Sequence, residues 1–513
     1  MTNEVRVRFA PSPTGPLHIG GVRTALYNYL FAKHFGGKFI LRIEDTDQSR
    51  FVPGAETYIK ESLSWLGIMP DEGFDGEGPH KPYRQSERQD IYRQYSEKLL
   101  KDNKAYLAFD TPEELEEMRN RLKSESDPMP QYNSLTRSSM KNSLTLSSSE
   151  IENRIRSKVP YVIRLMVPAN NEIRFKDLIR GWVNVSSDTI DDKILIKSDG
   201  LPTYHLANVV DDHLMGVTHV IRGEEWLPSA PLHILLYQFL NWNDSIPQFA
   251  HLPLLLKPEG TGKLSKRDGD KHGFPVFPIA WIDPQSGETS MGFREKGYLP
   301  DAMVNFLALL GWNPGTEQEI FEMDELIKAF SIDRINKAGA KFDIEKAKWF
   351  NQQYIKLMPD AELGSYLYSD LLNKGIKAEK DYTLRVASAF RERVTFLHEL
   401  YEKSIYFFIR PESYDEMVVK KKWTAQTVGF LKQYAIDLRK NNGGFSREIA
   451  KEMIIHILED LNISLGAIMP VLRVVVTGES AGIDLMETIE ILGTEEVSCR
   501  IDLAIDKLSS LMK

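Results

Sequence analysis

Cysteine is almost absent from this chain, since Cys499 is the only one among 513 residues. One cysteine excludes an intramolecular disulfide framework and a zinc site built from several cysteines. Long apolar runs are missing as well, and no stretch reaches the roughly 18 apolar residues that a membrane-spanning helix needs. The charged N-terminus enters a strand-like pattern at once, which leaves no room for a signal peptide. We therefore expect a soluble cytoplasmic protein.

Positive charge is also scarce. Lys and Arg number 64 against 73 Asp and Glu, which gives a formal net charge of −9. This balance does not indicate a nucleic-acid-binding protein, although an acidic chain can still carry a basic face. Basic residues do gather in the C-terminal half, at Arg385, Arg391, Arg393, Lys420 to Lys422, Arg439 and Lys440.

The N-terminal residues carry the clearest pattern of the chain. Apolar residues alternate with arginine from Val5 to Phe9, which predicts a strand, and Phe39 to Ile43 predicts a second one. Between them, apolar residues recur at helical spacing from Val22 to about Phe35. A turn rich in Pro and Gly precedes this helix, and the start of such a helix suits phosphate because unpaired N–H groups and the helix dipole favour an anion. The pattern predicts a βαβ unit with an anion site.

Two groups of acidic residues are candidates for ligand binding, metal binding or catalysis. Glu44, Asp45 and Asp47 follow the second strand, at the sheet edge where ligands usually bind. For Asp45 and Asp47 both Mg²⁺ contact and helix capping stay open. The second group is Asp211-Asp212-His213 with His219, for which we reject a metal site and a catalytic triad. The histidine spacing does not fit one helical face and no serine nucleophile elbow is present, so structural polar roles are expected.

Local patterns outline the remaining elements. Ser86 and Gln89 have the spacing of a capping box at a helix start. Two strands are predicted at 160–167 and 182–185, and helical patterns dominate from about residue 318 onward. His456 lies near an apolar stripe and is expected to be packed against its helix neighbours. That stripe consists of Ile449, Met453, Ile457 and Leu461.

Four motifs together resemble a known family. Arg8-Phe-Ala-Pro-Ser-Pro-Thr-Gly15, His18-Ile-Gly-Gly21 and Ile43-Glu-Asp-Thr-Asp47 resemble the start of class I aminoacyl-tRNA synthetases. Within that class the match is to the bacterial glutamyl-tRNA synthetases. Lys263-Leu-Ser-Lys-Arg267 resembles the KMSKS signature, with Leu264 in place of Met and Arg267 in place of the last Ser. The resemblance extends over essentially the whole chain.

The resemblance implies a fold in several parts. We expect an α/β Rossmann-like catalytic domain that is split by an α+β insertion and followed by mainly α-helical stem-contact and anticodon-binding domains. The expected boundaries are 1–106 and 199–256 for the two catalytic halves, 107–198 for the connective, acceptor-binding insertion, 257–345 for the KMSKS-like loop and stem-contact domain, and 346–513 for the helical anticodon-binding domains.

The resemblance also implies a reaction, in which ATP activates L-glutamate to glutamyl adenylate and the glutamyl group passes to the 3′-terminal adenosine of tRNA(Glu). Negative charge grows on the α-phosphate in the first step, and stabilising it requires preorganised donors rather than a protein nucleophile. The expected catalytic donors are His18, Lys263 and Lys266. The ATP-binding positions implied by the resemblance are His18, Gly20, Gly21, Lys263, Ser265 and Lys266, and Mg²⁺ accompanies the ATP.

The glutamate pocket can be argued from charge. Glutamate brings two carboxylates and one ammonium group, and the planar guanidinium of arginine can donate two hydrogen bonds to a carboxylate. By resemblance, Glu44 would receive the α-ammonium while Arg8 and Arg222 would hold carboxylates, with the choice between the two arginines left open. The positions that match the family's glutamate site are Arg8, Ser12, Glu44, Tyr204, Asn208, Arg222 and Trp226.

The same resemblance leads to expectations about bound metal, about contact with the anticodon and about the oligomeric state. One common version of the family holds zinc through Cys and His near the start of the insertion. Tyr106-Leu-Ala-Phe-Asp110 contains no cysteine, so no zinc and no other protein-bound metal is expected. Arg391 and Arg393 are candidates for anticodon contact. The family implies a monomer.

Three alternative functions would each leave a different mark on the sequence. A glutaminyl enzyme would need a neutral pocket for the side-chain amide, and Arg222 argues against it. A truncated relative that glutamylates a modified base in tRNA lacks the anticodon-binding half, whereas this chain has about 170 residues there. A non-catalytic RNA-binding paralogue should have lost its His or Lys donors, but His18 and Lys266 are present. Whether tRNA(Gln) is also charged, and which residues read the anticodon, stay open.

Overall fold

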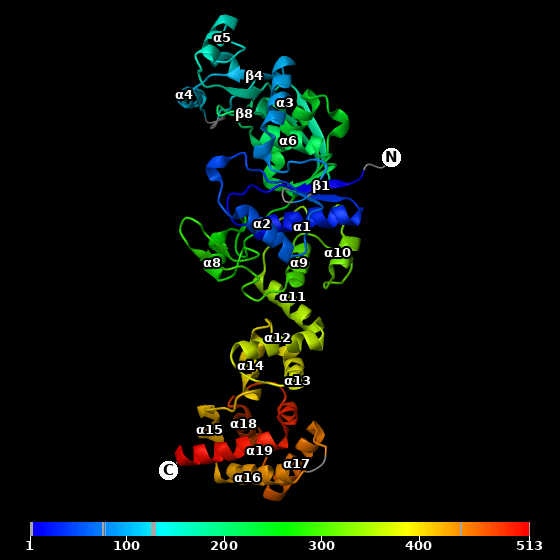
Figure 1. Ribbon diagram of the computed structural model, residues 1–513, viewed down its shortest axis with the longest axis vertical. Coiled ribbons are helices and arrows are strands. Elements are labelled where there is room, and N and C mark those ends of the chain that lie inside the picture. The colour runs from blue at the N-terminus through cyan, green and yellow to red at the C-terminus, as the bar shows by residue number, and fades with distance from the viewer. Residues whose placement is uncertain (1–3, 74–75, 77, 125–129, 442–443, 512–513) are drawn as a thin grey trace. The chain divides into compact units, whose positions relative to one another are not determined.

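The computed structural model describes residues 4–73, 76, 78–124, 130–441 and 444–511. The chain divides into two compact units. The first contains the described residues up to Lys296 together with Pro300–Ala347, and the second contains Gly297–Leu299 together with the described residues from Lys348 onward. An α/β first unit and a helical second unit confirm the fold class expected from the sequence (Figure 1).

The predicted βαβ unit opens the first unit. Strand β1 (Arg6–Phe9) pairs in parallel with β2 (Lys38–Leu41), which pairs in parallel with the short β3 (Glu72–Gly73). Helix α1 (Ile19–His34) joins β1 to β2 and buries most of its length, because apolar side chains surround nearly its whole circumference. A helix that is apolar on all sides must be covered on all sides.

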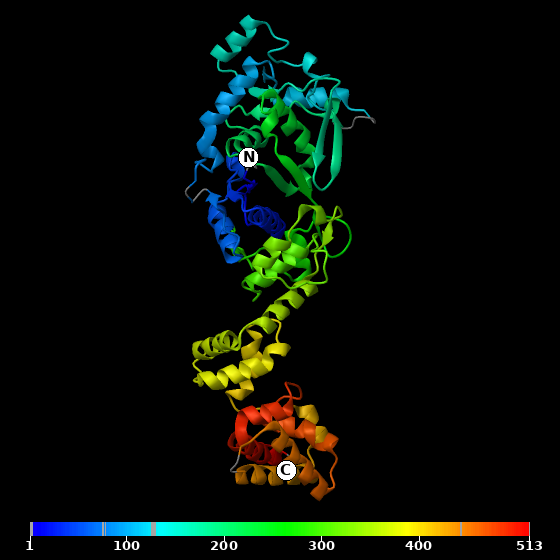
Figure 2. The same cartoon turned by 90° about the vertical axis from the view of Figure 1, so that its right-hand side faces the viewer.

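Helix α1 is held by segments from much later in the chain. Figures 1 and 2 show it side by side with α9 (Pro300–Leu309). The Tyr27 hydroxyl lies 3.0 Å from the carbonyl oxygens of both Ala308 and Leu310, and Arg23 donates to Leu310 O at 2.9 Å. These contacts hold the second and third turns of α1, directly after the turn where the anion site is expected, against the segment that contains α9.

A second sheet has the order β7-β6-β10-β9. Strands β6 (Glu172–Asp177) and β7 (Gly181–Ser186) form an antiparallel hairpin, and β6 also pairs in parallel with β10 (Gln248–Leu252), which pairs in parallel with β9 (His219–Gly223). The hairpin comes from the stretch in which the insertion was expected. The sequence pattern missed β6, whose alternate residues are buried.

The two sheets meet at β1 and the start of β9, where Thr218 N donates to Arg6 O at 2.9 Å. Helices α6 (Tyr204–Leu214) and α7 (Ala230–Phe239) supply apolar side chains to the core beside β9 and β10. The first unit also contains α2 (Ala55–Trp65), the 3₁₀ helix η2 (Gln85–Arg88), α3 (Gln89–Lys101), β11 (Leu255–Leu256), α8 (Lys266–His272), β12 (Trp281–Ile282), β13 (Thr289–Ser290), α10 (Met323–Ala329) and β14 (Ala340–Lys341).

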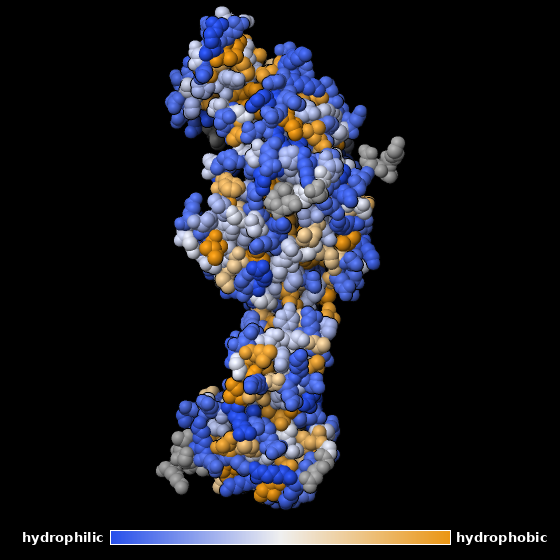
Figure 3. Space-filling model, in the orientation of Figure 1, coloured by the Kyte–Doolittle hydropathy of each residue, from blue (hydrophilic) through white to orange (hydrophobic). Residues whose placement is uncertain are grey.

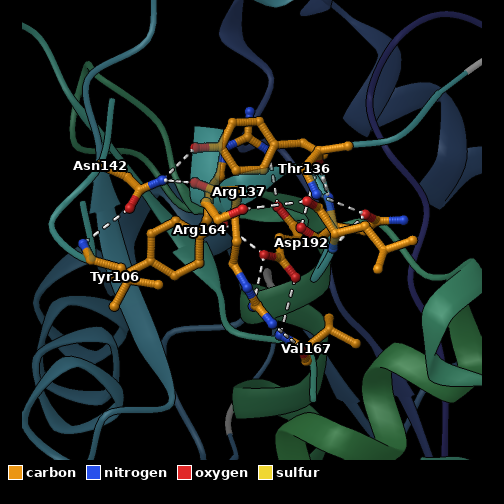
Figure 4. A network of polar contacts seen from close by, with 12 residues as sticks. Tyr106, Thr136, Arg137, Asn142, Arg164, Val167 and Asp192 are labelled. Atoms are coloured by element: carbon orange, nitrogen blue, oxygen red, sulfur yellow. Dashed lines mark hydrogen bonds and ion pairs between the residues drawn. The ribbon is translucent and has the colours of Figure 1, made fainter. Parts of the chain in front are cut away.

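A third, antiparallel sheet forms a module of its own on the far side of α3 and α6 from β1 (Figure 1). It consists of β4 (Ala105–Ala108), β5 (Val162–Leu165) and β8 (Ile194–Ile196), accompanied by α4 (Pro112–Leu122) and α5 (Ser148–Arg156). Figure 4 shows the polar network at its centre. The fully buried Asp192 accepts hydrogen bonds from the Tyr106 hydroxyl at 2.6 Å, Arg137 Nη1 at 3.0 Å and Val167 N at 3.1 Å.

The described part of the second unit consists of helices around two apolar cores. Figure 3 shows apolar residues scattered among hydrophilic ones on the face that it presents. Of the helices in the described part of the chain, none combines the length and the hydropathy that a membrane span requires. The helices are α11 (Ile344–Leu357), which starts at the end of the first unit, α12 (Asp360–Asn373), α13 (Lys380–Phe390), α14 (Glu399–Ser404), α15 (Glu416–Lys422), α16 (Ala425–Lys440), α17 (Arg447–Leu461), α18 (Leu465–Thr477) and α19 (Leu485–Leu511), with a break at Gly493.

The prediction that His456 is packed is wrong. Its side chain is 78 % exposed and lies 3.2 Å from Asp460, one helical turn further along α17. The buried face of α17 is centred beside the predicted stripe: Ala450, Ile454, Ile457 and Leu458 are buried, whereas Met453 is only partly buried and Leu461 is exposed. This shift turns His456 to solvent.

Candidate active site

A cleft of about 1340 Å³ in the first unit gathers every position that the sequence pointed to for catalysis or for glutamate. It is lined by the phosphate-side candidates His18, Gly20, Gly21, Lys263, Ser265 and Lys266, and by the glutamate-side candidates Arg8, Ser12, Glu44, Tyr204, Asn208, Arg222 and Trp226. These side chains come from the carboxyl ends of β1, β2 and β9, from the first turns of α1 and α6, and from the loop after β11. The carboxyl ends of parallel strands are where ligands of open α/β sheets bind.

His18 is the N-cap of α1. Its Nδ1 accepts a hydrogen bond from Gly20 N at 3.1 Å, so the ring proton must be on Nε2. Nε2 is buried and has no hydrogen-bond partner among the described residues. Burial, together with the nearby charge of Lys263, lowers the pKa of His18 to about 4. At neutral pH His18 is therefore a neutral imidazole with one unused N–H donor.

The N–H groups at the start of α1 differ from expectation, since they already have partners. Ile19 N donates to Val276 O at 3.0 Å, Gly20 N to His18 Nδ1, and Gly21 N to His18 O at 2.8 Å. A Cβ on Gly21 would lie 2.7 Å from Leu17 Cδ1, so an alanine here would need the end of the Leu17 side chain to shift. What α1 offers an anion is its dipole and the His18 Nε2 donor.

The basic loop faces the cleft with both lysines paired to carboxylates. Lys263 Nζ lies 2.6 Å from Glu225 Oε1, and Lys266 Nζ lies 3.8 Å from Glu288 Oε1. Each lysine is about half exposed, so these pairs are weak and a phosphate could replace either carboxylate. Leu264 between them is buried and anchors the loop.

Ser265 begins α8 with a capping box, in which its hydroxyl lies 2.6 Å from Asp268 Oδ2. This cap places Lys266 in the first turn of α8, on the rim of the cleft.

Arg8 and Glu44 belong to a buried network of charges. Arg8 Nε lies 3.0 Å from Asp212 Oδ1, and Arg42 Nη1 lies 2.8 Å from the same oxygen. Glu44 Oε1 accepts from Arg42 Nη2 and from Asn208 Nδ2, each at 3.0 Å. Burial raises the pKa of Glu44, and the positive charges of Arg42 and Arg8 oppose that rise.

Arg42 was not predicted from the sequence; it is fully buried directly after β2 and ties Asp212 to Glu44. The available signal was a charged residue inside an otherwise apolar run, because an arginine there requires buried carboxylates. The network also explains Asp212, which serves Arg8 and Arg42, and Asp211, which accepts from Arg88 Nε at 2.7 Å. The structural roles predicted for these two aspartates agree with these contacts.

Arg222 contrasts with Arg8 because it has no carboxylate within ion-pairing distance among the described residues. It is buried on β9, and its partners are neutral groups: His251 Nε2 at 3.0 Å, the Tyr204 hydroxyl at 2.8 Å and Trp226 O at 3.2 Å. Burial lowers the pKa of Arg222, and the side chain still remains charged. A buried guanidinium without a counterion is a binding site for an anion.

Asp45 and Asp47 have separate roles. Asp45 accepts from Ser86 N at 2.8 Å and from Ser86 Oγ at 2.5 Å, so it caps η2. The predicted capping box of Ser86 with Gln89 is wrong, because Ser86 lies inside η2 and the N-cap of α3 is Arg88, which makes no side-chain cap. Asp47 is exposed at the cleft and accepts from Ser49 and Arg50. Among the described residues no group of three or more His, Cys, Asp or Glu side chains is arranged to hold a metal ion.

Two protein-family descriptions match consecutive parts of this chain. Residues 4–349 match the family described as "tRNA synthetases class I (E and Q), catalytic domain", and residues 352–505 match "Anticodon binding domain". The chain is 57 % identical over 506 residues to the glutamate–tRNA ligase of Cytophaga hutchinsonii, covering 99 % of this chain and 98 % of the relative. It is 55 % identical over 509 residues to that of Porphyromonas gingivalis, covering 99 % and 100 %.

A solved structure gives the same result for the fold. The crystal structure of a glutamate tRNA ligase from Elizabethkingia meningosepticum, in complex with its amino acid, is 50 % identical with a TM-score of 0.94, covering 99 % of this chain and 100 % of that one. The family expected from the motifs is confirmed over almost the full length. The chain belongs to the glutamate–tRNA ligase family of class I tRNA synthetases.

Proposed function

We propose that this protein activates L-glutamate with ATP as enzyme-bound glutamyl adenylate and transfers the glutamyl group to the 3′-terminal adenosine of tRNA(Glu). The observation that carries the proposal is the buried Arg222, which lines the cleft without a carboxylate partner among the described residues. Such a cation favours an amino acid with an acidic side chain over its neutral amide, because the amide does not balance the buried charge.

Each end of glutamate has a matching group in the cleft. Arg222 would take the side-chain carboxylate, since Arg8 already has Asp212 as counterion. Glu44 would receive the α-ammonium through Oε2, because Oε1 is occupied by Arg42 and Asn208. Ser12, Tyr204 and Trp226 line the same space, and the last two form one wall with ring centroids 4.4 Å apart.

The nucleotide side supplies donors and no nucleophile. A glutamate α-carboxylate oxygen would attack the α-phosphorus of ATP, the bond to pyrophosphate would break, and Mg²⁺ held by the ATP phosphates would balance their charge. His18 Nε2–H and the ammonium groups of Lys263 and Lys266 would stabilise the negative charge that develops. The terminal 2′-hydroxyl of the tRNA would then attack the activated carbonyl and release AMP.

The second unit offers candidates for anticodon contact. Arg391 donates to Lys356 O at 2.7 Å, to Met358 O and to Asp360, so it fastens the end of α13 to the connection between α11 and α12. Arg393 is exposed, has no hydrogen-bond or ion-pair partner among the described residues for its guanidinium, and lines a cavity of about 670 Å³. Arg393 is therefore our candidate for RNA contact, and Arg391 is a support. We further propose that the enzyme acts as a monomer in the cytoplasm, without zinc.

ATP–pyrophosphate exchange tests the proposal, measured with glutamate or glutamine and with or without purified tRNA(Glu). We expect exchange with glutamate when tRNA is present, and little with glutamine. Exchange with glutamine at equal efficiency would reject the role given to Arg222. No exchange from folded protein in any combination would reject the ligase assignment and favour a non-catalytic RNA-binding paralogue.

A further inference from the structure

Behind Arg222 two fully buried residues continue its hydrogen bonds into the protein interior. His251 on β10 accepts from Arg222 Nε through Nε2 at 3.0 Å. Its other ring nitrogen, Nδ1, lies 2.6 Å from Asp177 Oδ2 at the end of β6. The three side chains therefore form one chain from the cleft to the hairpin β6–β7.

Asp177 is itself held firmly. Its Oδ1 accepts from the backbone N–H groups of Ile179 at 2.9 Å and Arg180 at 2.8 Å, and Oδ2 accepts from His251 N at 3.2 Å. Burial acts to raise the pKa of Asp177, but the hydrogen bonds from His251 and from these backbone groups outweigh it, so that the pKa is lowered. The carboxylate is ionised and cannot rotate without losing several hydrogen bonds.

The protons along this chain have one consistent arrangement. An ionised carboxylate only accepts, so His251 must carry its proton on Nδ1. Nε2 then has a lone pair, which is what Arg222 Nε–H needs. A proton on Nε2 would set two donors against each other, and Arg222 would have to turn away. The position of Arg222 therefore depends on Asp177 through the ring of His251.

The remaining contacts leave one edge of Arg222 open. Tyr204 and His233 accept from Nη1 at 2.8 and 3.4 Å, and Trp226 O accepts from Nη2 at 3.2 Å. One of the five N–H groups of a guanidinium, the second one on Nη2, has no such partner among the described residues. Asp177 stands on the opposite side of His251, so it cannot compete with a ligand for that edge.

We propose that Asp177 and His251 are positioning residues, which hold Arg222 in the orientation that binds the substrate's side-chain carboxylate and so contribute to the selection of glutamate over glutamine. This proposal rests on the proposed function. A guanidinium that offers one open N–H to a carboxylate loses affinity when it is rotated, because that N–H must point at the carboxylate oxygen. Glutamine, which gains little from Arg222, loses little from the rotation.

The variant Asp177→Asn tests this directly. The asparagine oxygen can take the place of Oδ1 and still accept from Ile179 N and Arg180 N. Its NH₂ group then takes the place of Oδ2, where it can no longer accept from His251 and instead faces Nδ1, which moves the ring proton to Nε2. We expect the KM for glutamate to rise about 10- to 100-fold, the range seen when orienting partners of metal-binding side chains are removed. The KM for ATP should change less than twofold, and the preference for glutamate over glutamine should shrink by the same factor as the glutamate KM rises.

Asp192→Asn is the matched control. Asp192 is equally buried in the same unit and also accepts hydrogen bonds from a side chain and from backbone, but its network ends at Tyr106, Arg137 and Val167 (Figure 4). This variant should leave the KM for glutamate unchanged. A similar rise in both variants would show a general loss of structure and overturn the proposal.

A double-mutant cycle with His251→Phe separates positioning from packing. Phenylalanine keeps a ring stacked near Phe249 and removes both nitrogens. If Asp177 acts through His251, the double variant should have the glutamate KM of His251→Phe alone. Additive rises would mean that the two residues act separately, and an unchanged KM in a folded His251→Phe would reject the proposal even if Asp177→Asn fails to fold. Wild-type exchange is measured first, so its absence would reject the proposed function instead.

Discussion

His18 combines two roles that can be separated. Its Nδ1 caps α1 by accepting from Gly20 N, while Nε2 is an unused donor buried at the cleft. Because the pKa is lowered to about 4, the donor is a neutral N–H over the whole physiological range. The imidazole is therefore suited to stabilise negative charge by a hydrogen bond and is not suited to transfer a proton.

We expect His18→Ala to reduce the rate of glutamate activation by about 10²- to 10³-fold, as for the loss of one donor to a developing oxyanion. His18→Asn should lose the same activity and retain the melting temperature, because asparagine caps helices well but is too short to replace Nε2. Melting curves and pyrophosphate exchange on both variants distinguish the roles. An active His18→Asn enzyme would show that the cap alone matters.

Arg391 and Arg393 are two residues apart and should respond differently to substitution. Arg393→Ala should weaken tRNA binding and reduce the slope of log affinity against log salt by about 1. Arg391→Ala should instead destabilise the second unit by about 1 to 3 kcal/mol, because the partly buried carbonyl groups of Lys356 and Met358 lose their donor. Filter binding at several salt concentrations, with melting curves, compares the two. The assignment is wrong if Arg391→Ala changes the salt slope and Arg393→Ala does not.

At the scale of elements, the module of β4, β5 and β8 depends on one buried carboxyl group. Burial raises the pKa of Asp192 to about 6, against the hydrogen bonds from Tyr106 and the charge of Arg137. The folded protein therefore binds this proton more tightly than the unfolded chain, whose aspartates titrate near 4. The stabilisation from the proton is complete below about pH 4 and is lost as the pH rises through 6, a change of at most about 3 kcal/mol.

Asp192→Asn should remove this part of the pH dependence. We expect the melting temperature of the wild type minus that of Asp192→Asn to fall between pH 4.5 and pH 7. Differential scanning fluorimetry in matched buffers measures it. A difference that rises with pH would mean that the ionised carboxylate is the favoured form in the folded module.

The loop before α8 depends on an apolar anchor between its two lysines. Leu264 is buried, and its N–H donates to Leu255 O at 2.8 Å. Leu264→Met should be close to neutral, because the volume is conserved. Leu264→Ala should raise the KM for ATP several-fold with little effect on the KM for glutamate, since it loosens Lys263 and Lys266. Steady-state exchange kinetics compare the two variants, and equal effects on both KM values would contradict a specific role for the loop.

Some helices and strands could be predicted from the sequence, whereas the pairing of distant strands could not. The strands and helix of the first βαβ unit were predicted because period and turn residues are local signals. The pairing of β6 with β10 was not, because Asp177 and Phe249 lie opposite each other through contacts that no local pattern encodes. Arg42 and the pair of Asp177 with His251 share this property, because Arg42 needs Asp212 and Asp177 needs His251, and both partners are distant in sequence. The glutamate-side positions were found only because the motif resemblance supplied them.

For the whole molecule, the net charge of −9 makes a clear prediction about RNA. Binding of tRNA must rely on local basic residues, so the affinity should fall steeply between about 50 and 200 mM salt. Fluorescence anisotropy with labelled tRNA(Glu) measures this. An affinity that is insensitive to salt would show that contacts to phosphate contribute little.

The ion pair of Arg8 with Asp212 has a consequence for synthesis on the ribosome. The two residues are separated by 204 positions, and Arg42 also depends on Asp212. Domains fold as the chain emerges, but non-local contacts must wait for their partners. A nascent chain that ends before α6 has two arginines in a hydrophobic strand environment without this carboxylate, so β1 and β2 cannot reach their native burial. The cleft can therefore be completed only after α6, which carries Asp212, and β9, which carries Arg222, have been synthesised.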